Sequence, residues 1–149
     1  MRIIFNIEHY EIYKASFSSA GWTTELEKLF LHYSGKKHFS HSAAELLVAE
    51  NEVERLLNYV EKYLSIDELE RYYKVFASDY PEKTLEMFKE VLIPYADNNT
   101  GRSYYENLLS LLKQMSRIKG GEKAASDLVA DFRLNYKNRR AMMEVLSGF

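Results

Sequence analysis

Apolar residues recur along most of the chain at the spacing of an α-helix. Residues 52–64 illustrate the pattern, because their apolar positions follow the i, i+3, i+4, i+7 rule for one helical face. The same spacing predicts a helix from residue 66 to a stop at Asp79-Tyr80-Pro81. It predicts further helices over residues 81–96, 102–118, 122–136 and 139–147. The sequence therefore indicates a chain that is helical from residue 52 onward.

Polar and small residues mark the ends of these helices. Ser65-Ile66-Asp67-Glu68 has the form of a capping box, in which a hydroxyl and a carboxylate each satisfy a free backbone N–H. Pro81 suits the first turn of a helix, where its missing N–H costs nothing. Residues 97–101 form the strongest turn signal in the chain. Gly120-Gly121 predicts a helix end, since glycine tolerates the left-handed conformation there.

The first fifty residues give a weaker pattern. Capping boxes at residues 24–27 and 42–45 predict helices that run to about Tyr33 and about Glu50. Residues 4–18 fit a helix as well, although residues 3–7 could instead form a strand. We expect a helix there.

Short connections between these segments predict antiparallel helix pairs, over residues 43–64, 66–96 and 102–136. The doublets Tyr72-Tyr73 and Tyr104-Tyr105 lie 32 residues apart, and each belongs to the first helix of a pair. Ala124-Ala125 would let two helices approach closely. We therefore expect one all-α domain over residues 1–149, a tetratricopeptide-like or HEAT-like right-handed helical array, with N-terminal helices in 1–41 and paired helices in 42–147. A plain helical bundle is the alternative.

Composition supports this fold and excludes several classes. Of the 149 residues, 46% are apolar, which is typical of a globular chain. Only six Gly and two Pro are present, too few for the many turns of an all-β fold. The absence of Cys excludes disulfides, zinc ribbons and a thiol nucleophile. With neither a secretory leader pattern nor an apolar run of membrane-spanning length, we expect a cytoplasmic protein that does not contact a membrane.

One stretch carries a resemblance to a known family. The matching residues are Pro81, Leu85 and Phe88, then Arg102-Ser103-Tyr104, then Leu108, Leu111 and Leu112, and finally the run from Phe132 to Met142 that contains Arg133, Tyr136, Arg139 and Arg140. Residues 81–143 thus resemble the C-terminal helical region of bacterial SWIM zinc-finger proteins. The finger itself, which holds zinc through Cys and His, is absent here. The resemblance implies an accessory region of a larger protein, used for protein contacts, and it implies no catalytic residue.

The sequence contains no pattern that predicts catalysis. A nucleophile elbow, a phosphate loop and a dinucleotide fingerprint are all missing. The four histidines, His9, His32, His38 and His41, lack the fixed helical spacing of metal ligands. We therefore predict a non-enzyme without cofactor or metal.

Charge and aromatic content suggest a binding role instead. Residues 43–97 hold 13 acidic and six basic residues, whereas residues 102–140 hold nine basic and four acidic ones. Tyr is abundant, at twelve residues, and is favoured at protein interfaces. We assign Tyr72, Tyr104 and Tyr136 to the core. The candidate interaction surface comprises Tyr33, Tyr59, Tyr63, Tyr80, Tyr105, Arg117, Lys119, Lys137, Arg139 and Arg140.

Two functions fit these observations. The first is a non-catalytic helical-repeat module that binds a protein or peptide partner. The alternative is a nucleic-acid-associated helper that uses the basic C-terminal segment, although a net charge of −2 argues against it. If Arg139 and Arg140 are structural, they lie near helix ends or neutralise neighbouring acids, and we expect this outcome.

Overall fold

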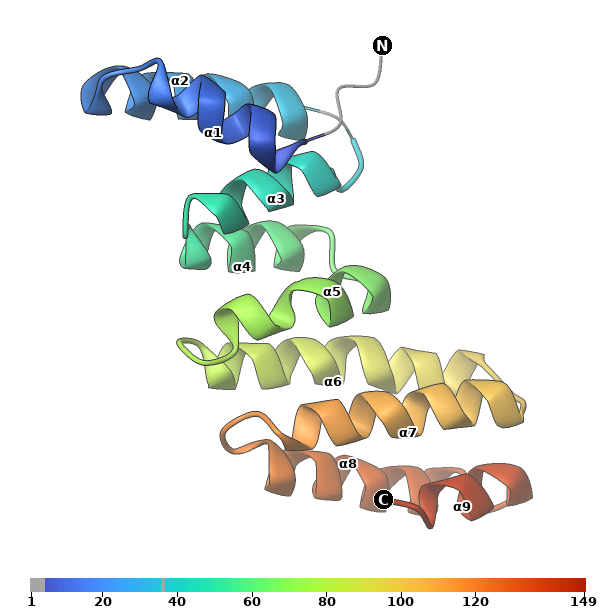
Figure 1. The fold of residues 1–149 in the computed structure, drawn as a ribbon. Coiled ribbons are helices and arrows are strands. Elements are labelled where there is room, and N and C mark those ends of the chain that lie inside the picture. Colours follow the sequence, from blue (N-terminus) through green and yellow to red (C-terminus); the bar gives the residue numbers. More distant parts are fainter. Residues whose placement is uncertain (1–4, 36) are drawn as a thin grey trace. The chain divides into compact units, whose positions relative to one another are not determined.

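The computed structural model describes residues 5–35 and 37–149, and within them the chain forms nine α-helices (Figure 1). These are α1 (Ile7–Ala15), α2 (Ser19–Ser34), α3 (His41–Ala49), α4 (Val53–Lys62), α5 (Ile66–Phe76), α6 (Pro81–Asn98), α7 (Arg102–Ser116), α8 (Gly121–Asn135) and α9 (Arg140–Leu146). The all-α prediction is confirmed. Of residues 3–7, where we expected a helix, residues 3 and 4 lie outside the described residues, residues 5 and 6 are neither helix nor strand, and Ile7 begins α1.

The chain divides into two compact units, Met1–Tyr63 and Leu64–Phe149. Unit 1 contains α1 to α4, and unit 2 contains α5 to α9. Each unit has its own buried apolar residues.

In unit 1, three helices pack in sequence order, α2 against α3 and α3 against α4. Helix α3 supplies the most deeply buried part, because Ala43, Ala44, Leu46 and Leu47 have no exposed surface. Helix α1 contributes much less to the buried part of unit 1 than α3 does. Tyr10 is its one buried residue, and its ring meets the edge of Trp22 on α2 at a centroid distance of 5.7 Å.

Three helix starts in unit 1 differ from the sequence prediction. Helix α1 begins at Ile7, where the Asn6 side chain accepts the Glu8 N–H, so the helix is shorter than residues 4–18. Helix α2 begins at Ser19 with Ser18 as its N-cap, not at Thr24. Helix α3 is capped by Ser40, not Ser42. The reason is that Ser18 and Ser40 have the extended backbone that an N-cap requires.

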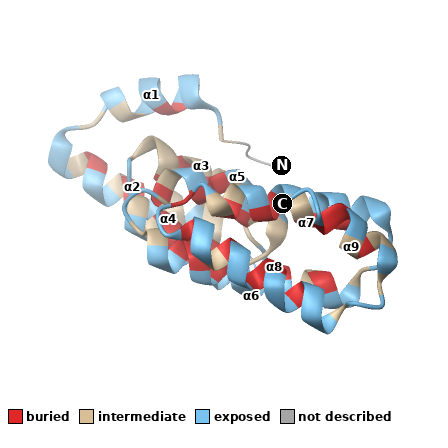
Figure 2. Ribbon diagram, turned by 90° about the horizontal axis from the view of Figure 1, so that it is seen from below, coloured by how far each residue is buried: buried red, intermediate tan, exposed pale blue. Residues whose placement is uncertain are grey.

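In unit 2 the predicted pairs are present. Helix α5 packs against α6, and α7 packs against both α8 and α9, with α6 bridging to α7 and α8. Consecutive helices run antiparallel, so α5 and α7 run in the same direction (Figure 1). Buried residues form stripes along these helices, separated by exposed ones (Figure 2). The Ser65 cap of α5 is confirmed, since its hydroxyl accepts the Glu68 N–H.

The turn between α7 and α8 depends on both glycines. Gly120 has a φ of +79°, the left-handed conformation that the sequence predicted. Gly121 lies against the end of α7, where an added Cβ would come within 2.0 Å of the Met115 carbonyl oxygen. A side chain at residue 121 would therefore push the two helices apart.

Helix α6 continues through a proline. Pro94 lies inside the helix and cannot donate to the Glu90 carbonyl oxygen four residues earlier. Both Glu90 and Pro94 are exposed, so water can take the place of the missing donor. This position explains why the helix reaches Asn98 despite an interior proline.

The tyrosine doublet of α7 is oriented opposite to the prediction. Tyr105, assigned to the surface, is 4% exposed, and Tyr104, assigned to the core, is 45% exposed. Tyr105 lies in phase with the buried Leu108 and Leu112, whereas Tyr104 is one residue and about 100° away from that face. The core assignment of Tyr72 is confirmed.

Candidate functional site

A groove on unit 2 brings charged side chains of two helices together. Its volume is about 540 Å³. Lys74 of α5 lines one side, and a row on α7 lines the other: Glu106, Leu109, Ser110, Lys113, Gln114 and Arg117. The α7 row follows the i, i+3, i+4, i+7, i+8, i+11 spacing, which places all of it on one helical face. We call this hollow the α5–α7 groove.

The two walls of the groove are joined by a side-chain hydrogen bond. The Gln114 amide donates to the Glu70 carboxylate over 2.9 Å. Lys74 lies one helical turn beyond Glu70. Because α5 and α7 run in the same direction, Lys74 is placed near the end of α7 that carries Arg117.

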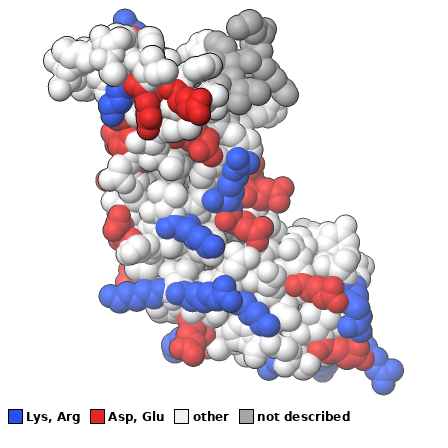
Figure 3. All heavy atoms as spheres, viewed as in Figure 1, with Lys and Arg blue, Asp and Glu red and all other residues white. Residues whose placement is uncertain are grey.

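The cations of the groove are free of ion pairs within the part of the chain that the structure describes. Among the described residues, no carboxylate forms an ion pair with Lys74, Lys113 or Arg117, and no side-chain hydrogen bond engages them. Burial raises the pKa of the neighbouring Tyr73 hydroxyl, and the positive charge of Arg117 opposes that rise. Figure 3 shows Lys and Arg side chains gathered over the α5 and α7 region of unit 2. Here the surface offers positive charge to a ligand.

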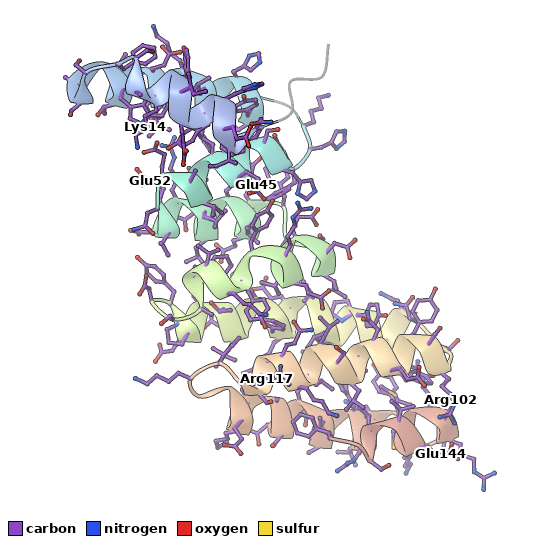
Figure 4. All side chains as sticks on the ribbon, in the orientation of Figure 1. Lys14, Glu45, Glu52, Arg102, Arg117 and Glu144 are labelled. Carbon is purple, nitrogen blue, oxygen red and sulfur yellow. The ribbon has the colours of Figure 1, made fainter. Side chains whose placement is uncertain are left out.

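The basic C-terminal segment does not form one patch. Arg117 and Lys119 follow α7, whereas Lys137, Arg139 and Arg140 follow α8, which runs back in the opposite direction. The 15 residues of each helix separate the two groups by about 22 Å. Arg117 accordingly lies at the end of α7 far from Arg102, which pairs with Glu144 of α9 over 2.7 Å (Figure 4).

Arg139 has a structural role, as expected. Its guanidinium donates to the backbone carbonyl oxygens of Ala96 and Asp97, at 2.6 and 3.2 Å, and so satisfies the end of α6. The same guanidinium lies 4.2 Å from the ring centre of Tyr136. Arg140 is exposed and has no such contact among the described residues.

Two more residues of the run from Phe132 to Met142 also hold helix ends. Arg133 donates to the carbonyl oxygen of Leu146 at the end of α9, over 2.9 Å. The Tyr136 hydroxyl donates to the Asp97 carboxylate over 3.0 Å. Tyr136 is half-buried, so its predicted core position is only partly reached. The spacing of this run thus serves helix packing in unit 2.

Unit 1 contains a second hollow, of about 340 Å³, between α1, α2 and α3. Aromatic and apolar groups line most of it: Phe5, Tyr10, Tyr13, Tyr33, Leu29 and Leu46, with Asn6 and His9 at polar positions. Tyr33, a candidate surface residue, is half-buried here.

A carboxylate next to this hollow collects three donors. Glu50, at the end of α3, accepts from the Tyr10 hydroxyl, from Trp22 Nε1 at 2.9 Å and from the Lys14 ammonium at 3.1 Å. Lys14 also lies 5.6 Å from the Trp22 ring centre. Burial alone would raise the pKa of Glu50, but the hydrogen bonds outweigh it and the pKa is lowered. With all its partners internal, this cluster fastens α1 to α2 and α3.

The remaining tyrosine candidates take different positions. Tyr59 is 7% exposed, which contradicts its assignment to the surface. Its ring stacks on Phe39 at 4.8 Å, and its hydroxyl accepts the Ser40 N–H. Tyr63 and Tyr80 are half-buried, and Tyr80 precedes Pro81 as the N-cap of α6.

The other basic candidates lie outside the α5–α7 groove. Lys119 and Lys137 are both exposed, and neither lines this hollow. Sequence reasoning missed Lys74 and Lys113, because only the adjacency of α5 and α7 brings them together.

Comparison with known proteins gives no further guide: no family model, no curated protein and no solved structure matches the chain. Within residues 5–35 and 37–149, no group of three His, Asp or Glu side chains could hold a metal ion. None of the helices in that part of the chain combines the length and apolar character needed to cross a membrane.

Proposed function

We propose that this chain is a non-catalytic, helical-repeat interaction module that binds a segment of a partner protein in the α5–α7 groove. The observation that carries the proposal is the groove itself, in which Lys74, Lys113 and Arg117 are exposed and form no ion pair with any carboxylate of the described residues. Arrays of helix pairs form extended binding surfaces from the first helix of each pair. Helices α5 and α7 hold that position in unit 2, as in a tetratricopeptide-like or HEAT-like array.

The sequence resemblance is compatible with this role. A SWIM-like helical region would be an accessory part of a larger protein and would contribute contacts instead of chemistry. Arg133, Tyr136 and Arg139 of that region hold helix ends, which leaves them unsuited to bind a partner. The ligand-binding role therefore falls to a different face, on α7.

Selection from a display library of random peptides tests the proposal. Hydrogen–deuterium exchange would then locate the bound peptides on the protein. We expect selected peptides to slow exchange over residues 106–117 of α7, and the double variant Lys113→Gln/Arg117→Gln to lose them. The matched control is Lys137→Gln/Arg140→Gln, which removes the same charge at the other end of α8. Peptides that protect only unit 1, or robust enzymatic turnover in a substrate panel, would contradict the proposal.

A further inference from the structure

The α5–α7 groove has a direction. Glu106 lies at one end of the α7 row and Arg117 at the other, eleven residues and about 16 Å apart. Lys113 lies one turn before Arg117 on the same face, and Lys74 joins them from α5. Glu106 therefore makes one end of the groove negative, and at the other end three cations outnumber the single carboxylate of Glu70, which is bonded to Gln114.

This polarity limits the ligand. Three cations that line one groove, with no ion pair to any described residue, favour two or three carboxylates within a few residues of each other. Glu106 repels a carboxylate and favours a cation or a hydroxyl donor at the opposite end. An extended peptide rises about 3.3 Å per residue, so about five residues span the distance between the two ends.

The same features disfavour a nucleic acid. A strand of phosphates carries negative charge along its whole length and would bring it against Glu106, whereas the proposed peptide changes its charge before that end. None of the described residues that line the groove is aromatic, so they offer bases no ring to stack on. The second basic group of the segment lies about 22 Å away at the end of α8, where Arg139 is occupied by the end of α6.

We propose that the α5–α7 groove binds an acidic peptide segment, whose Asp or Glu side chains pair with Lys74, Lys113 and Arg117 and whose Lys, Arg or Ser about five residues away meets Glu106. This inference rests on the proposed function and specifies its partner. Leu109 and Ser110 line the groove between Glu106 and the cations, and Gln114 lies among the cations, where it donates to Glu70.

Fluorescence anisotropy with two labelled hexapeptides tests the inference. The first peptide, Glu-Asp-Glu-Gly-Ser-Lys, has the proposed polarity, and the second, Glu-Asp-Glu-Gly-Glu-Glu, is acidic throughout. At low salt we expect the first to bind more tightly to the natural chain. Lys113→Gln/Arg117→Gln should weaken it by about tenfold, because two exposed ion pairs are lost. Lys137→Gln/Arg140→Gln should leave binding unchanged.

The variant Glu106→Gln provides a separate readout. It should reduce the preference for the first peptide over the second, because the repulsion of the second peptide disappears. The inference would be overturned if the first peptide bound equally to Lys113→Gln/Arg117→Gln and to Lys137→Gln/Arg140→Gln. It would also be overturned if a labelled oligothymidine bound more tightly than the first peptide and this binding depended on Lys113 and Arg117. If library selection yields apolar or basic peptides that protect α7 while neither hexapeptide binds, the proposed acidic partner is wrong but the proposed interaction function is retained. If no peptide protects α7, both fail.

Discussion

The Arg139 guanidinium donates to the carbonyl oxygen of Ala96 over 2.6 Å and thereby joins the turn after α8 to the end of α6. A helix end leaves carbonyl groups without partners, and a charged donor is a strong one. The contact connects residues 43 positions apart in the sequence.

Replacing Arg139 with Ala should therefore destabilise unit 2. Loss of hydrogen bonds from a charged donor typically costs about 1.5–3 kcal/mol in the free energy of unfolding. Urea titration followed by circular dichroism measures this cost. Arg140→Ala is the matched control, since an exposed side chain without partners should change the free energy by less than about 0.5 kcal/mol. Equal effects of the two substitutions would refute the structural role of Arg139.

Glu50→Ala should loosen unit 1. The substitution leaves the Tyr10 hydroxyl and Trp22 Nε1 without an acceptor, at a cost of about 1–3 kcal/mol. Trp22 is the chain's one tryptophan, so its fluorescence during urea unfolding reports on this unit. Glu54→Ala removes an exposed carboxylate of α4 and serves as the control. An unchanged Trp22 transition in Glu50→Ala would show that the cluster does not hold α1.

The stability of unit 1 should depend on pH at both extremes. The pKa of Glu50 is lowered on folding, so its contribution is present above its ordinary value of 4.5 and is lost as pH falls through the folded-state pKa. Burial raises the pKa of Tyr10 above its ordinary value of 10.0, and the hydrogen bond to Glu50 and the negative charge of Glu50 raise it further. That contribution is present below pH 10.0 and is lost as pH rises toward the folded-state pKa. Urea midpoints of the Trp22 signal should fall in both directions. Glu50→Gln should flatten the acid side, and an equally steep acid decline in that variant would argue against Glu50 as its source.

The two tyrosines of α7 should respond unequally to truncation. Tyr105→Ala removes a buried ring and should cost about 3–5 kcal/mol in the free energy of unfolding, as for other buried aromatic residues. Tyr104→Ala removes an exposed ring and should cost less than about 1 kcal/mol. Chemical denaturation of the two variants side by side decides the point. A larger effect at Tyr104 would mean that the helical phase of α7 is wrong.

Alanine at the two glycines should separate conformational strain from steric clash. Gly120→Ala forces a side chain into the left-handed conformation, at about 1–2 kcal/mol. Gly121→Ala should cost more, because its Cβ would overlap the Met115 carbonyl oxygen. The melting temperatures of the two variants show which substitution destabilises the protein more. A milder effect at Gly121 would indicate that α7 and α8 can separate without loss.

The sequence predicted the helices of unit 2 well, because their apolar stripes have a strong helical period and clear end signals. Pro81 and Ser65 act where the pattern placed them. Unit 1 was harder, since several Ser and Thr residues near each start could serve as N-cap. The choice among them depends on backbone conformation, which the residue pattern does not encode. The orientation of the Tyr104-Tyr105 doublet could have been found from the phase of Leu108 and Leu112.

The candidate site was less accessible to prediction. Arg117 was selected from its charge, but Lys74 and Lys113 become part of a site only when α5 and α7 lie side by side. The opposite error occurred at the turn after α8. There, a cluster of basic residues in the sequence separates into a helix-end donor, Arg139, and an exposed neighbour, Arg140. Linear charge density does not distinguish these roles.

Helix α9 is only seven residues long and packs on α7, which precedes it by more than twenty residues. A helix of that length is not stable alone in water. During synthesis on the ribosome, α7 and α8 emerge first, and the part of α7 that α9 covers stays in contact with water until residues 140–146 have left the exit tunnel. The surface of α7 that α9 covers therefore depends on residues 140–146, so a chain shortened before residue 140 would leave that surface open to water.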